Sequence, residues 1–140
     1  HELICVFKNG RARHQNHFGL ERYRTNVLDY AGACGFYKGR QADLEAHPTV
    51  KPTALIGDLM LDCSSRGDLI LDPCLGSGTT LLAAHHTGRR GRGIEIDPLY
   101  VDTAIRRLTS ATGTGAVHAD GRTFEKVADQ RQAEREASNG

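Results

Sequence analysis

The sequence predicts an α/β fold in which a strand, a glycine loop, a helix and a second strand follow one another. The apolar run over 68–71 has the length of a strand that is buried on both faces. Residues 76–78 (GSG) come next, where a side chain would block close approach of the backbone. Residues 79–86 read as a helix that ends at Gly88, and residues 92–96 as the second strand. This order is typical of half of a site for an adenosine cofactor.

Length and composition fit one globular domain. The chain has 140 residues, of which 39% are hydrophobic and 25% charged. The net charge of +1 argues neither for nor against nucleic acid, because local patches matter more than the sum. No stretch of 18 apolar residues occurs, so we expect no membrane span. The four cysteines form no C-x-x-C pair, which predicts free thiols in a cytoplasmic protein, and we assign no metal site.

The first third of the chain is basic and irregular. Residues 3–7 read as a strand, and because the chain starts inside a pattern we expect it to be a piece of a longer protein. Residues 11–46 show no sustained periodicity. Across 1–40, seven Lys or Arg residues face three acidic ones, a surplus of about four positive charges.

One run in this segment, Arg22-Tyr23-Arg24-Thr25-Asn26, combines cations, an aromatic ring and an amide. Such a mixture suits phosphate contacts together with base stacking or the readout of base edges. The alternative is a solvated basic loop in which Tyr23 and Tyr30 only hold the segment against the core.

Two further helices are expected on either side of the strands. The first begins after Pro52, carries one apolar stripe and is predicted to end at Gly67. Lys51 directly before it is unusual, because the positive end of the helix dipole disfavours a cation. A nearby carboxylate ligand would explain it, and a plain surface lysine is the alternative. The second helix spans 98–108, and the charged tail over 125–140 is expected to fray.

Three kinds of cofactor chemistry compete for the glycine loop. A P-loop needs a lysine after its last glycine, and none follows Gly78. A dinucleotide-binding loop needs a third glycine, where this chain has Leu81. S-Adenosylmethionine has no pyrophosphate and needs a glycine loop against its amino-acid end. Asp72 can answer its ammonium group, the loop amides its carboxylate, and Glu95 its ribose hydroxyls.

These motifs resemble those of the amino-DNA methyltransferases, which make N6-methyladenine or N4-methylcytosine. Residues 72–80 (DPCLGSGTT) resemble the cofactor loop of that family. Residues 93–100 resemble its second cofactor motif, and residues 47–52 the motif that precedes the loop. The segments 22–27 and 1–10 are also similar to parts of the family. The order is that of the β group, in which the cofactor half follows the catalytic half.

The resemblance implies a partial Rossmann-like S-adenosylmethionine-dependent methyltransferase sheet with flanking helices, and residues 1–124 as the C-terminal part of this domain. It implies transfer of a methyl group from S-adenosylmethionine to N6 of adenine or N4 of cytosine in DNA. Arg22, Arg24 and Asn26 are the candidates for DNA contact within 11–46. The candidates for cofactor binding are Lys51, Asp72, Pro73, Gly76, Ser77, Gly78, Thr79 and Glu95.

One family motif is missing from this chain. Members carry [DNS]-P-P-[YFW], which holds the target amine of a flipped base, and no such tetrapeptide occurs here. In the β-group order it would precede His1, so we assign no catalytic residue and expect this chain alone to be inactive. The missing N-terminal catalytic half and DNA are the expected partners. Without that half, an apolar sheet edge beside 69–71 would stay open.

Other functions fit the same motifs. A methyltransferase of this fold that acts on RNA or protein would carry a similar loop. A non-catalytic S-adenosylmethionine-binding module, or the remnant of a gene, would also lack the catalytic tetrapeptide. A dinucleotide-dependent oxidoreductase is a more distant alternative, because the third glycine is absent.

Overall fold

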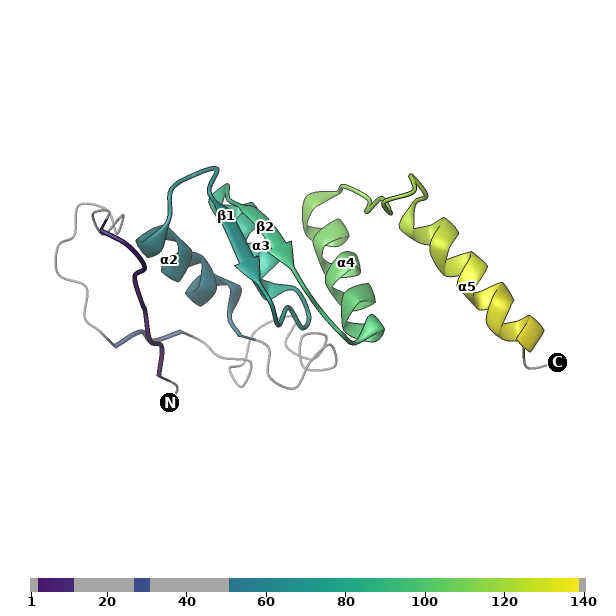
Figure 1. Cartoon of the computed structure of the whole chain (residues 1–140), viewed down its shortest axis with the longest axis horizontal. Helices are drawn as coiled ribbons and strands as arrows, with labels where there is room; N and C mark the ends of the chain where they lie inside the picture. The colour runs from purple at the N-terminus through teal and green to yellow at the C-terminus, as the bar shows by residue number, and fades with distance from the viewer. Residues whose placement is uncertain (1–2, 12–26, 31–50, 139–140) are drawn as a thin grey trace.

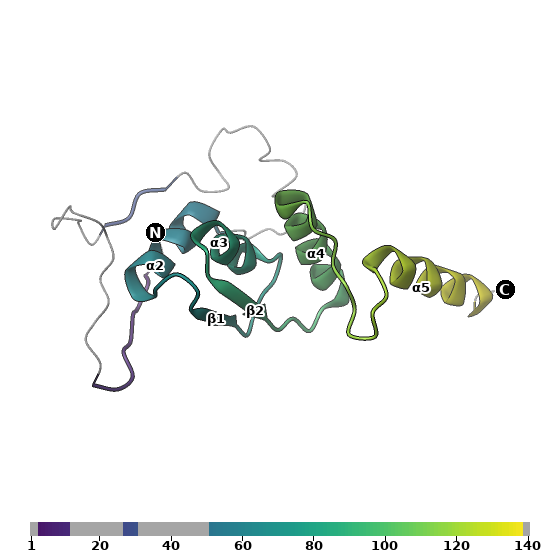
Figure 2. The ribbon, with the colours of Figure 1, turned by 90° about the horizontal axis from the view of Figure 1, so that it is seen from above.

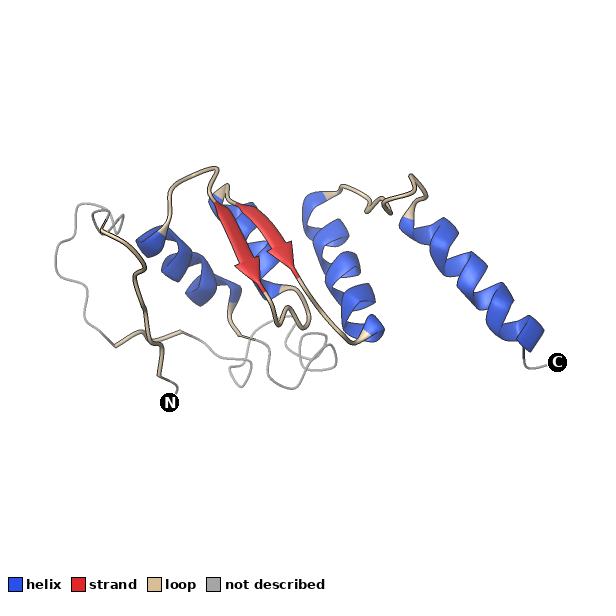
Figure 3. Ribbon diagram, viewed as in Figure 1, coloured by secondary structure: helices blue, strands red, loops and turns tan. Residues whose placement is uncertain are grey.

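The computed structural model describes residues 3–11, 27–30 and 51–138. Helices and strands alternate in its central part, which confirms the predicted α/β class (Figure 3). In chain order the elements are α2 (Thr53–Cys63), β1 (Leu69–Asp72), α3 (Thr79–Thr87), β2 (Arg90–Gly93), α4 (Pro98–Thr112) and α5 (Phe124–Ser138).

The two strands form a parallel pair joined through α3. Leu69 is paired with Arg90 at one end of the register and Asp72 with Gly93 at the other. β2 therefore ends before the predicted strand over 92–96 would, and Glu95 follows it in a loop. Main-chain pairing still continues by one residue, because the Ile94 amide donates to the Asp72 carbonyl at 2.9 Å.

α2 and α3 cover one face of this small sheet (Figures 1 and 2). The buried cluster between them contains Met60, Ala83 and Ala84. On the opposite face no described element covers the sheet, and Leu69 and Leu71 are 57% and 61% exposed. The prediction that this strand is buried on both faces is therefore wrong for the described part of the chain.

Glycines on β2 make room for large side chains that come from the loop and helix. A Cβ atom at Gly91 would lie 2.6 Å from Leu81 Cδ2, and one at Gly93 would lie 2.6 Å from Leu75 Cδ2. Leu81 stands where a dinucleotide-binding loop has its third glycine. The close packing of helix and strand that this third glycine normally permits is supplied here by Gly91 on the strand.

α2 ends at Cys63 rather than at the predicted Gly67. Ser64 turns into an extended conformation, and its hydroxyl donates back to the Met60 carbonyl. Arg89, which lies between α3 and β2, stabilises this turn. Its Nη2 donates to the Ser64 carbonyl and its Nε to the Ser64 hydroxyl. Gly67 adopts a positive φ of 86° in the following turn.

The start of α4 confirms the predicted helix, which continues to Thr112. Asp97 caps it, with Oδ1 accepting from the Leu99 amide at 2.8 Å, and Pro98 stands at the first position. Gly113, with φ of 69°, ends the helix.

The prediction of a strand over 3–7 is wrong. Residues 3–11 contain no helix or strand, and Leu3 and Phe7 are almost fully exposed, because no strand in the described part of the chain pairs with this segment. The tail, which we expect to fray, contains α5, which has no buried residue and lies beyond α4, away from the sheet (Figure 1). Side-chain bonds one turn apart support α5, from Gln130 to Glu134 at 2.8 Å and from Gln132 to Glu136 at 3.1 Å. No helix in the described ranges is long and apolar enough to cross a membrane.

The substitution Gly91→Ala tests whether the glycine on β2 is what allows α3 to pack closely against the strand. Its methyl group would crowd Leu81 and lie 3.4 Å from Ala84 Cβ, so we expect a loss of about 1–3 kcal/mol in the free energy of unfolding. Urea denaturation followed by circular dichroism measures this. Gly115→Ala is the control, because a Cβ there meets nothing within 4 Å. Equal unfolding midpoints for the two variants would contradict the packing argument.

Candidate cofactor site

The residues predicted to bind the cofactor gather at the carboxyl ends of the two parallel strands. Asp72 is the last residue of β1, and Glu95 follows the end of β2. The loop 73–78 connects β1 to α3 at the same edge. In open α/β sheets this edge is where ligands bind, because loop amides and a helix N-terminus converge there.

Asp72 braces the loop from within. Its Oδ2 accepts from the Thr80 hydroxyl at 2.5 Å, and its Oδ1 accepts from the Cys74 amide at 3.0 Å. These bonds tie the end of β1 to both the start of the loop and the first turn of α3. Pro73 follows as an exposed residue.

Glu95 closes the loop from the segment that follows β2. Its Oε2 accepts from the Gly76 amide at 2.7 Å, and its Oε1 accepts from the amides of Ile96 and Asp97, both at 2.9 Å. A carboxylate offers about four lone-pair sites. A ribose hydroxyl can therefore join these amides or replace one of them.

Three of the predicted cofactor residues are buried. Ser77 and Thr79 are 5% and 8% exposed, and Gly78 is packed against α4. A Cβ at Gly78 would lie 2.8 Å from Ala104 Cβ and 3.1 Å from its Cα, and φ at this residue is 86°. The glycine is thus required by the close approach of α4 as well as by the turn.

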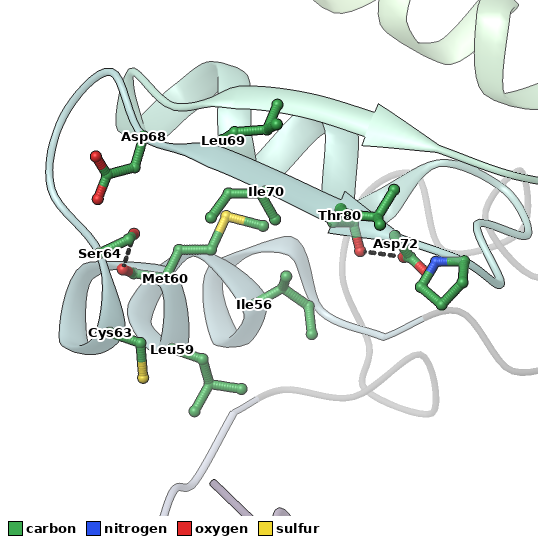
Figure 4. Close-up of a pocket in the computed structure, with 12 residues that line it drawn as sticks. Ile56, Leu59, Met60, Cys63, Ser64, Asp68, Leu69, Ile70, Asp72 and Thr80 are labelled. Atoms are coloured by element: carbon green, nitrogen blue, oxygen red, sulfur yellow. Dashed lines mark hydrogen bonds between the residues drawn. The ribbon is translucent and has the colours of Figure 1, made fainter. Parts of the chain in front are cut away.

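A cavity of about 540 Å³ opens between α2 and the free edge of β1 (Figure 4). Asp72, Pro73 and Thr80 line it beside the loop, and Met60 and Ile70 lie further along it. It reaches the site from the side where the described chain has no neighbouring strand.

Of the remaining predicted residues, the structure describes only Lys51, and it lies away from this site. Lys51 is exposed directly before α2 and does not line the cavity. Arg22, Arg24 and Asn26 lie outside the described residues. Tyr30 does contact the core, because its hydroxyl donates to Asp58 of α2, as the alternative for the basic segment predicts.

The one thiol that lines the cavity among the described residues is not poised as a nucleophile. Cys63 lines it, and the pKa of its thiol is raised, first by partial burial and second by the nearby Asp62 carboxylate. The thiol thus stays protonated at neutral pH, the form that does not act as a nucleophile. In the described part of the chain, no group of three His, Cys, Asp or Glu residues could hold a metal ion.

Three residues that shape the loop escaped sequence reasoning. Thr80 bonds Asp72, Ala104 packs on Gly78, and Arg107 Nη1 donates to the carbonyl and hydroxyl of Ser77 at 2.8 and 2.7 Å. Ala104 and Arg107 are three residues apart and share one face of α4. That spacing was the available signal, but nothing in the sequence says which helix meets the loop.

Comparison with known proteins identifies the family. A family model described as DNA methylase matches residues 1–106. The chain belongs to this family of amino-DNA methyltransferases. Among solved structures, that of the M1.HpyAVI–SAM complex is 40% identical to the chain and covers 44% of it, with a TM-score of 0.43.

Individual relatives match the same portion. The type II methyltransferase M.HpaI of Haemophilus parainfluenzae is 45% identical over 86 residues, which is 61% of this chain and 26% of the relative. The DNA adenine methyltransferase YhdJ of Escherichia coli (strain K12) is 44% identical over 70 residues, or 50% and 24%. The structure of the cytosine-N4-specific PvuII DNA methyltransferase aligns with a TM-score of 0.52 and 26% identity, covering 61% and 32%. The chain thus spans about a quarter of the curated relatives.

Thr80→Val tests whether the bond to Asp72 braces the loop. It keeps the shape of the side chain and removes the donor, so we expect a loss of about 1–2 kcal/mol in the free energy of unfolding. Chemical denaturation measures it.

Thr103→Val is the matched control for that variant. The Thr103 hydroxyl bonds only within its own helix, to the exposed Leu99 carbonyl, among the contacts described. A loss as large as that of Thr80→Val would show that the threonine hydroxyl at 80 has no special role in the loop.

Proposed function

We propose that the chain is the cofactor-binding part of a DNA methyltransferase that transfers a methyl group from S-adenosylmethionine to N6 of adenine or N4 of cytosine. The observation that carries this proposal is the closed loop between the two strand ends. There the Glu95 carboxylate accepts the Gly76 amide, and Asp72 holds Thr80 and Cys74. Family membership supplies the chemical class.

The polar groups of the loop suit the two ends of the cofactor. Carboxylates at 72 and 95 flank a turn whose glycines at 76 and 78 have φ of 53° and 86°, a backbone course that other residues rarely adopt. One end can pair with an ammonium group and the other with ribose hydroxyls. No lysine follows the loop to bind a phosphate, in agreement with a cofactor that lacks one.

S-Adenosylmethionine supplies an electrophilic methyl group that an exocyclic amine can attack in line. The chain contributes positioning rather than covalent chemistry. Asp72 and Glu95 would orient the two ends of the cofactor, and Pro73 would border the methionine end where the cavity begins. Lys51 near the carboxylate is a further proposal that rests on the family resemblance.

The catalytic half would dock at the open side of the sheet. β1 has no neighbour on that edge within the described residues, and its exposed face carries Leu69 and Leu71. A strand placed there would satisfy the unpaired main-chain groups of β1 and would end beside Asp72. We propose that the missing N-terminal half provides this strand, along with the target-amine site, and that DNA is held by it and by the basic segment 11–46.

The substitution Glu95→Ala in the longer protein that includes the catalytic half tests the cofactor assignment. Loss of the carboxylate removes both the proposed ribose contact and the bond to the Gly76 amide, so we expect affinity for S-adenosylmethionine to fall more than tenfold. Titration calorimetry measures it, with Glu95→Gln as a milder variant that keeps an amide oxygen.

Glu125→Ala, in the first turn of α5, is the control for the loss of one carboxylate. Its affinity should equal that of the unmodified protein. If Glu95→Ala and Glu95→Gln both bind as tightly as this control, while circular dichroism shows them folded, the ribose assignment is wrong.

The chain on its own is expected to transfer no methyl group to DNA, because it contains no [DNS]-P-P-[YFW] tetrapeptide. The measurement is incorporation of labelled methyl from S-adenosylmethionine into DNA of mixed sequence, with the longer protein as the positive reaction. Incorporation above the level without protein would overturn this expectation.

A further inference from the structure

The segment 95–107 contacts the glycine loop at several points. Three consecutive loop residues, 76–78, each contact a different part of it. The first gives its amide to a carboxylate, the last packs on Ala104, and the middle one, Ser77, is bonded by Arg107. The loop conformation is therefore set from α4 as well as from β1.

Arg107 and the Leu75 carbonyl together hold the two ends of one peptide group of this loop. Its Nη1 donates to the Ser77 carbonyl at 2.8 Å, and the amide on the other side of that peptide, at Gly78, donates to the Leu75 carbonyl at 3.1 Å. Because a peptide group is planar, bonding both ends leaves it no freedom to rotate. The same Nη1 lies 2.7 Å from the Ser77 hydroxyl.

Burial makes these bonds matter. Ser77 is only 5% exposed, so water cannot easily replace a lost donor. A bond from a guanidinium is charge-assisted and stronger than one between neutral groups. Without this bond, the Ser77 carbonyl would be a buried acceptor with no donor. The free-energy cost of that state would favour rotation of this peptide group toward solvent.

We propose that Arg107 is a positioning residue of the cofactor site, which holds the backbone of the glycine loop in one conformation before the cofactor arrives. This role rests on the proposed function of the loop as the S-adenosylmethionine site. It follows from preorganisation: a loop that is already ordered loses less entropy on binding. Arg107 acts through Ser77 and needs no contact with the ligand.

Its neighbour on α4 provides a matched comparison. Arg106 is exposed and lies over the Phe124 ring, with the guanidinium carbon 4.9 Å from the ring centre, and it makes no described contact with the loop. Arg107→Met and Arg106→Met remove the same charge from the same helix and keep a long apolar stem. Only the first removes a donor to Ser77.

The experiment combines two measurements on the chain. Hydrogen exchange without ligand reports protection of the peptide covering 74–80, with α2 as the internal reference. Calorimetry reports affinity for S-adenosylmethionine. We expect Arg107→Met to lose loop protection about tenfold and affinity about tenfold while α2 exchanges as before, Arg106→Met to change neither, and Arg107→Lys to recover part of both losses.

The two arms separate this inference from the function on which it rests. If Arg107→Met keeps both loop protection and affinity at the level of Arg106→Met, the inference is overturned. Loss of protection in α2 and the loop alike would also overturn it, since Arg107 would then be a general stabilising residue. If the unmodified chain and the longer protein bind no S-adenosylmethionine, the proposed function fails. Hydrogen exchange of the loop would still show whether Arg107 orders it.

Discussion

The bond between the Glu95 carboxylate and the Gly76 amide is the contact on which the site depends. It joins the loop after β1 to the turn after β2, at the one edge where both strands end. The same carboxylate orders the two amides that precede α4, so it also sets where that helix begins. α4 then returns to the loop through Ala104 and Arg107. One acidic residue thus connects the end of β2, the glycine loop and the start of α4.

Glycines stand opposite larger side chains wherever the loop, β2, α3 and α4 pack closely together. β2 contributes glycines facing Leu75 and Leu81, while the loop contributes Gly78 facing Ala104. Each close approach pairs a missing side chain with a present one. A loop with a leucine in the third position can therefore pack as closely as one with three glycines, provided that the glycine moves to the partner strand.

The sequence was sufficient for the parts that rest on local chemistry. The strand–loop–helix–strand order and the Asp97 cap of α4 were predictable from neighbouring residues, as was the placement of Asp72 and Glu95 at the ends of the two strands. The segment 3–7 was not, because an apolar run becomes a strand only where a partner strand exists. The role of Arg107 also depended on distance through space rather than along the chain, and no periodicity reveals it.

The bare side of β1 has a consequence for how such a chain must be handled by the cell. Within the described residues, β1 has an unpaired edge beside exposed leucines, and such an edge is a template for pairing with any extended polypeptide, including another copy of itself. The β1–α3–β2 unit makes its contacts within a short stretch of sequence, so it can form quickly. If this unit folds before its neighbours, the unpaired edge of β1 is exposed early. Aggregation is then avoided best when the complementary strand has already been synthesised and lies nearby.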